Sequence, residues 1–192
     1  MPPASPLPAP VAEDVTVLFS SAQIATRIAE LAAAIAAAEP QRLLVLAVLK
    51  GSFVFAADLI RALHGVGLRP EMEFITLSSY GEQQVSGGAV RVVHDVESDV
   101  AGRDVLLIDD ILESGRTLAF AKDLMARRGA RRAMTCVLLQ KAGKRVVPIE
   151  ADFVGFDCPD SFVVGYGMDD AHAYRQLPFV GVVAADRAAG SN

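Results

Sequence analysis

Three carboxylates and a glycine-containing turn follow a short apolar segment, and together they are suited to holding a phosphorylated sugar. Asp109, Asp110 and Glu113 lie within five positions of one another, and acids this close repel unless a cation or hydroxyl groups lie between them. Residues 114–117 come next and open an expected helix, where backbone N–H groups point outward at its positive end. Gly115 removes a side chain that would block close approach. The carboxylates can accept hydrogen bonds from hydroxyl groups, and the adjacent backbone amides can bind a phosphate. A sugar phosphate needs both.

The elements around these residues predict an α/β domain with a mostly parallel, twisted sheet flanked by helices. A helix is expected from Ser20 or Ser21 to Pro40, because Gln23 completes a capping box and Ile24, Ile28, Leu31 and Ile35 share one helical face. Further helices are expected at 53–65 and 117–128, and strands at 43–49, 71–79, 104–108, 133–139 and 179–184. Alternation of strands and helices favours parallel pairing, and such sheets bind ligands at the carboxyl ends of their strands.

Length and composition set limits on the class of protein. The 192 residues fit one domain, which we place at 13–192, after a Pro-rich, disordered tail at 1–12. The net charge of −5 argues against a protein that coats nucleic acid. The apolar run 43–49 is too short to cross a membrane, and no secretory signal is evident. Two cysteines without CxxC spacing indicate a reduced, cytoplasmic protein.

The segment VLLIDDILESGRTL, residues 105–118, resembles the phosphoribosyl-pyrophosphate motif of the type I phosphoribosyltransferases. Other segments narrow the resemblance to the hypoxanthine and hypoxanthine-guanine phosphoribosyltransferases, and it runs from about residue 13 to 187. These segments are VLKGSFVFAADL (48–59), SSYG (78–81), LLQK (138–141), DFVGFDCPDSFVVGYGMD (152–169) and YRQLPFVGV (174–182). Their order and spacing together are strongly specific. The resemblance implies the type I fold, with a small hood from the two terminal segments and a flexible lid loop.

The resemblance also implies which residues bind phosphoribosyl pyrophosphate. Asp109 and Asp110 would face the ribose hydroxyls and their Mg²⁺, and Asp169 would help hold a second Mg²⁺. The 5′-phosphate would lie in the loop that begins at Glu113 and continues through Ser114, Gly115, Arg116 and Thr117. Leu49, Lys50 and Gly51 would form the pyrophosphate loop, which often contains a cis peptide in this family, and Arg175 would meet the pyrophosphate.

The purine side of the site follows from the same resemblance. Lys141 would donate to the purine O6, Phe162 would stack on the base, and the backbone of Val163 would read its edge. Ser79 and Tyr80 would start a lid that runs to about Asp95. Glu113 stands where the family usually has an aspartate proposed to take the purine N7 proton. The additional methylene lengthens its reach while the acid strength hardly changes, so we expect the role to survive with altered geometry.

The expected activity is purine salvage. The phosphoribosyl group would pass from phosphoribosyl pyrophosphate to hypoxanthine or guanine, giving IMP or GMP and pyrophosphate, and the family suggests a homodimer or homotetramer. Two alternatives remain open: a regulator with this fold that binds RNA or DNA, and a transferase for xanthine or another base. The arginines at 127–128 and 131–132 could suggest RNA binding. Cations at a helix carboxyl end complement its dipole, which explains these arginines better.

Overall fold

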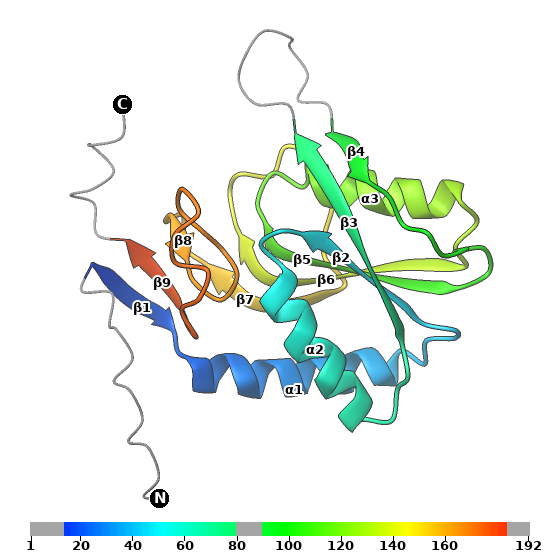
Figure 1. Cartoon of the computed structure of the whole chain (residues 1–192), viewed down its shortest axis with the longest axis horizontal. Coiled ribbons are helices and arrows are strands. Elements are labelled where there is room, and N and C mark those ends of the chain that lie inside the picture. The colour runs from blue at the N-terminus through cyan, green and yellow to red at the C-terminus, as the bar shows by residue number, and fades with distance from the viewer. Residues whose placement is uncertain (1–13, 80–89, 184–192) are drawn as a thin grey trace, which may run out of the picture.

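The computed structural model describes residues 14–79 and 90–183, and it contains one large and one small sheet (Figure 1). The expected tail at 1–12 lies outside the described residues. The large sheet has the strand order β4-β3-β2-β5-β6-β7, and every neighbouring pair is parallel except β3 and β4. Its strands are β2 (Leu44–Leu49), β3 (Glu71–Ser79), β4 (Val90–His94), β5 (Asp104–Leu112), β6 (Arg132–Lys141) and β7 (Phe153–Cys158). The expected α/β class and mostly parallel sheet are confirmed.

Helices cover both faces of the large sheet (Figure 1). The helices α1 (Ser21–Ala37) and α2 (Phe53–Gly65) pack together on one face, and α3 (Arg116–Arg127) lies on the other. The four α1 residues expected on one helical face are all buried. Ser20 caps α1 with the expected box: its side chain accepts from the Gln23 N–H, and the Gln23 side chain accepts from the Ser20 N–H at 2.9 Å.

Strand β2 explains why the run 43–49 is apolar on both alternations. Val45 and Ala47 belong to the core beneath α1 and α2, whereas Leu44, Leu46 and Val48 belong to the core beneath α3. A central strand buried on both faces needs this composition, since successive side chains point to opposite faces. The strand therefore holds its carboxyl end, where the Lys50 turn begins, at the middle of the sheet.

The small sheet joins the two ends of the described chain. It has the order β1-β9-β8, with β1 (Val15–Phe19), β9 (Val180–Val183) and β8 (Val163–Val164) paired antiparallel. The strand expected at 179–184 is thus present, but it lies in this sheet, while β7 forms the edge of the large one. Figure 1 shows the small sheet to one side of the large sheet. Among the described residues, no helix is long and apolar enough to cross a membrane.

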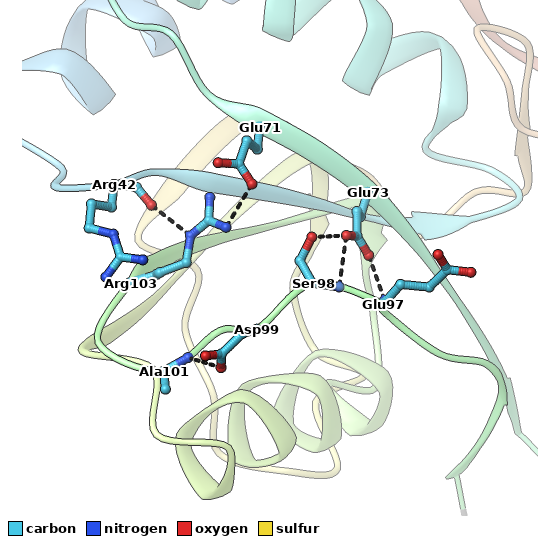
Figure 2. Close-up of polar contacts among 8 residues, drawn as sticks. All are labelled: Arg42, Glu71, Glu73, Glu97, Ser98, Asp99, Ala101 and Arg103. Atoms are coloured by element: carbon cyan, nitrogen blue, oxygen red, sulfur yellow. Dashed lines mark hydrogen bonds and ion pairs between the residues drawn. The ribbon is translucent and has the colours of Figure 1, made fainter.

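The connection between β4 and β5 is fastened to the first residues of β3 (Figure 2). Glu73 on β3 accepts from the N–H groups of Glu97 and Ser98 at 2.8 and 2.9 Å, and from the Ser98 hydroxyl. Burial alone would raise the pKa of Glu73, but these hydrogen bonds leave it below its usual value. Buried Arg103 donates to Glu71 at 2.7 Å. These contacts fix the start of β5.

Candidate active site

Asp109 and Asp110 lie in the last part of β5, which extends to Leu112 rather than ending at residue 108 as expected. The strand continues because Asp109 and Ile111 still pair in register with β6. Asp109 is 8% exposed, and its carboxylate accepts from the Asp110 N–H at 3.0 Å. Burial raises the pKa of Asp109 well above its usual range, and repulsion from Asp110 adds to this; burial also raises the pKa of Asp110. A bound cation would relieve both effects.

The turn from β5 to α3 contains the residues expected to hold the 5′-phosphate. Gly115 is the N-cap of α3 and has a φ of +81°, a conformation that favours glycine. A Cβ there would lie 2.7 Å from the Ile149 side chain and 3.0 Å from the Val147 carbonyl oxygen. The Ser114 carbonyl accepts from the N–H groups of Val146 and Val147 at 2.9 and 3.1 Å. The glycine is therefore required by the segment packed behind the loop.

A second turn, after β2, brings Lys50 and Gly51 against the carboxylates. The Leu49–Lys50 peptide bond is cis, in agreement with the sequence-based expectation. A Cβ on Gly51 would lie only 1.7 Å from Asp110 Oδ2, so the absence of a side chain allows this approach. A Cβ on Gly167 would lie 2.3 Å from the Gly51 carbonyl oxygen, which brings the segment before β9 to the same point.

These elements enclose a first cavity of about 340 Å³ at the carboxyl ends of β2 and β5. Its wall contains the expected phosphoribosyl-pyrophosphate residues from both turns: Lys50, Gly51, Asp109, Asp110, Glu113, Ser114, Gly115 and Thr117. Carboxylates line one part of the wall and the start of α3 lines another. The cavity has the donors and acceptors that a sugar phosphate needs.

A second cavity of about 380 Å³ shares part of its wall with the first. Lys50, Gly51, Ile111, Asp110 and Glu113 line both. The remaining wall contains the expected purine-binding residues Lys141, Phe162, Val163 and Asp169, together with Met168 and Arg175. The two cavities therefore meet at Asp110 and Glu113.

The side chains in the second cavity differ in exposure. Phe162 is 59% exposed, so its ring is open to a planar ligand, whereas Val163 is buried in β8 and offers its backbone. Lys141 is buried at the end of β6, with its Nζ 3.7 Å from Glu113 Oε1. The carboxylate and the ammonium thus lie on the same side of the cavity.

Asp169 and Arg175 form an ion pair at the edge of this cavity. Arg175 Nη2 lies 2.6 Å from Asp169 Oδ1, and its Nη1 donates to the Gly167 carbonyl at 2.6 Å. Asp169 also accepts from the His172 N–H at 2.9 Å. Asp169 and Arg175 are therefore direct neighbours. The first is expected to hold a second Mg²⁺ and the second to meet the pyrophosphate.

Some expected residues are not placed in the cavities. Arg116 begins α3 but is not among the residues that line either cavity. Ser79 ends β3, and Tyr80 lies outside the described residues together with 81–89. Of the expected lid, Val90–His94 forms strand β4, which pairs with β3. Conversely, the sequence analysis missed Lys144, which contacts Glu113 from a loop without any recognisable motif.

The carboxylates suit a magnesium ion that is shared with a substrate. In residues 14–79 and 90–183, no three His, Cys, Asp or Glu side chains gather into a self-sufficient metal site. Mg²⁺ is commonly bound by one or two carboxylates, with substrate oxygens and water completing its octahedron. The buried Asp109 and the partly buried Asp110, which repel one another, fit that mode.

The chain matches a known protein family over most of its length. The family model described as a phosphoribosyl transferase domain matches residues 14–171. Together with the parallel sheet, this match defines a type I phosphoribosyltransferase.

Relatives of known name narrow the class. The chain is 42% identical to the hypoxanthine-guanine phosphoribosyltransferase of Bacillus subtilis, over 87% of this chain and 92% of the relative. It is 40% identical to the hypoxanthine phosphoribosyltransferase of Salmonella typhimurium, over 88% and 95%. A lysine-to-arginine mutant of the Trypanosoma cruzi hypoxanthine phosphoribosyltransferase, solved with the product IMP, is 37% identical with a TM-score of 0.87, over 93% and 95%. The chain belongs to the hypoxanthine-guanine phosphoribosyltransferase family of purine salvage enzymes.

Proposed function

We propose that this chain transfers the 5-phosphoribosyl group from phosphoribosyl pyrophosphate to hypoxanthine, guanine or both, giving IMP or GMP and pyrophosphate. One observation carries the proposal beyond family membership: a cavity suited to a sugar phosphate and a cavity suited to a planar base share Asp110 and Glu113 in their walls. The reacting carbon of the sugar must face the base at such a junction.

The phosphate end is held by the backbone of the loop before α3. Ser114, Gly115 and Thr117 line the first cavity at the positive end of the helix. Because the Ser114 carbonyl is bonded to Val146 and Val147, the loop is fixed before substrate arrives. A rigid loop needs no reordering when it accepts the 5′-phosphate, which favours binding.

The ribose hydroxyls face Asp109 and Asp110, which would also hold Mg²⁺. The ion, when bound, would neutralise the developing charge on pyrophosphate. Departure of pyrophosphate with its bonding electron pair leaves positive charge on the sugar ring, as in glycoside cleavage. Lys50 lines both cavities, and Arg175 lies at the edge of the second; these two cations attract the departing anion.

The base end is built around Glu113. As N9 of the purine bonds to C1 of the sugar, the N7 proton must leave, and Glu113 is the carboxylate at the junction of the cavities that can take it. Lys141 donates to O6, and the exposed ring of Phe162 stacks on the base. Both hypoxanthine and guanine carry O6, so these contacts do not separate them.

The test is pyrophosphate release from phosphoribosyl pyrophosphate, Mg²⁺ and hypoxanthine, with guanine and xanthine in parallel. Glu113→Gln should lower kcat by about 10²-fold or more, as expected for loss of a proton acceptor, with little change in phosphoribosyl-pyrophosphate affinity. Glu150→Gln, at a position outside both cavities, is the matched control. Equal losses in turnover and affinity would show that Glu113 is only a structural acid. Absence of pyrophosphate release with every purine would refute the proposed activity.

A nucleic-acid role has little support, because the arginines around the end of α3 are paired with carboxylates. The pairs are Arg127 with Asp123, Arg128 with Asp95, and Arg131 and Arg132 with Asp104. We further propose a cytoplasmic enzyme, supported by two free buried thiols, and a homodimer or homotetramer, to be determined by light scattering.

A further inference from the structure

The loop that follows β6 is fastened behind the loop before α3, and it carries Lys144, which contacts Glu113 in the wall of the purine cavity, the second of the two cavities described above. The N–H groups of Val146 and Val147 donate to the Ser114 carbonyl, which fixes the backbone two residues after Lys144. The Lys144 side chain is about half exposed and extends back toward Glu113. Its place relative to Glu113 is therefore determined by backbone hydrogen bonds rather than by chance contact.

Lys144 lies between two carboxylates, Glu113 in the wall of the purine cavity and Asp160 outside it. Its Nζ is 3.4 Å from Glu113 Oε1 and 2.6 Å from Asp160 Oδ1. Asp160 belongs to the loop between β7 and β8, two residues before Phe162. The hydrogen bond to Asp160, and then that to Glu113, raises the pKa of Lys144, which keeps its charge at working pH. The lysine thus connects the proton acceptor to the loop that carries the stacking ring.

A second cation, Lys141, also contacts Glu113, at 3.7 Å. In the proposed reaction Lys141 donates to the purine O6, so its contact with Glu113 weakens when a base is bound. Lys144 is not among the residues that line the purine cavity. It can therefore remain on Glu113 while the base occupies the site.

The length of Glu113 decides whether this contact exists. An aspartate there would withdraw the carboxylate by about one carbon–carbon bond, roughly 1.5 Å. From a separation of 3.4 Å, that change would break direct contact with Lys144 Nζ. The contact is thus available to this chain's glutamate but not to the aspartate that is usual in the family.

We propose that Lys144 is a positioning residue for the transfer reaction: it orients the Glu113 carboxylate toward the purine and so compensates for the longer side chain at this position. The inference rests on the proposed function. Asp160 restrains the lysine, and its own negative charge is offset by the same ammonium group.

The test compares Lys144→Met, Lys144→Arg and the matched control Lys122→Met, which removes a lysine that is paired with Asp152 and lies outside the two cavities. Lys144→Met should lower kcat about fivefold, the scale of an exposed ion pair, and leave KM for phosphoribosyl pyrophosphate unchanged. Lys144→Arg should restore most of kcat. The difference in kcat between Lys144→Met and wild type should shrink at high salt, which screens the contact.

A second pair of variants separates positioning from a structural role. In the Glu113→Asp background the contact is already broken, so adding Lys144→Met should change kcat less than about twofold. An equal fivefold loss in both backgrounds, or no loss in either, overturns the inference. A wild-type enzyme without pyrophosphate release would instead refute the proposed function. An active wild type with unaffected Lys144→Met refutes only the role of Lys144.

Discussion

Gly51→Ala should lower catalytic efficiency strongly while the protein still folds. The added Cβ would lie 1.7 Å from Asp110 Oδ2 and 2.6 Å from Asp110 Cγ, so the carboxylate must retreat by about 2 Å to reach an ordinary contact. A misplacement of about 1 Å in a catalytic arrangement can lower the rate about 10²-fold. We therefore expect kcat/KM for phosphoribosyl pyrophosphate to fall about 100-fold, which corresponds to about 2.7 kcal/mol.

The stability change should be smaller in effect, because the atom that must move is the end of a side chain rather than backbone. Local overpacking costs about 1–3 kcal/mol, and each kcal/mol lowers the melting temperature by about 2–4 °C in a domain of this size. Gly65→Ala at the end of α2 is the control, since its Cβ would meet nothing within 4 Å. Kinetics and thermal melts of both variants provide the test. If Gly51→Ala keeps kcat/KM within about threefold of wild type, the close approach of Gly51 to Asp110 does not govern binding.

Two further predictions concern stability and reactivity away from the site. Asp104 is fully buried and accepts from the Gln41 N–H at 2.8 Å, from Arg132 at 3.0 Å and from Arg131, so Asp104→Asn should lower the free energy of unfolding by about 2 kcal/mol in urea titrations at pH 7. Burial alone would raise the pKa of Asp104, but these donors lower it overall. Its stabilisation is therefore fully present above the unfolded value of 3.8 and is lost progressively as pH falls through the lower folded value; a separation between the two variants that does not narrow as pH falls below 3.8 would contradict this. Burial raises the pKa of the Cys136 thiol far above its usual range, so a thiol reagent at pH 8 should label Cys136 only on unfolding, and rapid labelling of folded protein would disprove its burial.

The sequence predicted elements best where hydrophobic burial alone determines them. The apolar face of α1 and the doubly buried β2 have strong, uninterrupted patterns, and both were found where expected. By contrast, β1 is short and partly exposed, and β7 contains Gly155 and Asp157, so neither has a clear alternation. Nor could local pattern show that β9 pairs with β1, since that pairing joins residues at opposite ends of the domain.

The candidate site was predictable in its residue types but not in its contacts. The acids and the turn at 113–117 are close together in sequence, and all of these residues except Arg116 line one cavity. The sequence explains Gly115 only by the close approach of a ligand. The structure adds a second reason, because its positive φ and the packing of Val147 and Ile149 against it also require glycine. The contact between Lys144 and Glu113 depends on side-chain reach across two loops, which spacing does not reveal.

The pairing of β1 with β9 has a consequence for the order in which the protein is made. Residues 44–141 contain β2 to β6 and emerge from the ribosome well before Val180–Val183. Strand β1, although synthesised first, has to wait for the last strand before it gains its antiparallel neighbour. The part of the chain that lines the first cavity can thus take shape during translation, whereas β8, which contributes Val163 to the second cavity, gains its partner β9 only when synthesis is nearly over. A nascent chain stalled before residue 180 should consequently contain the first cavity without a finished second one.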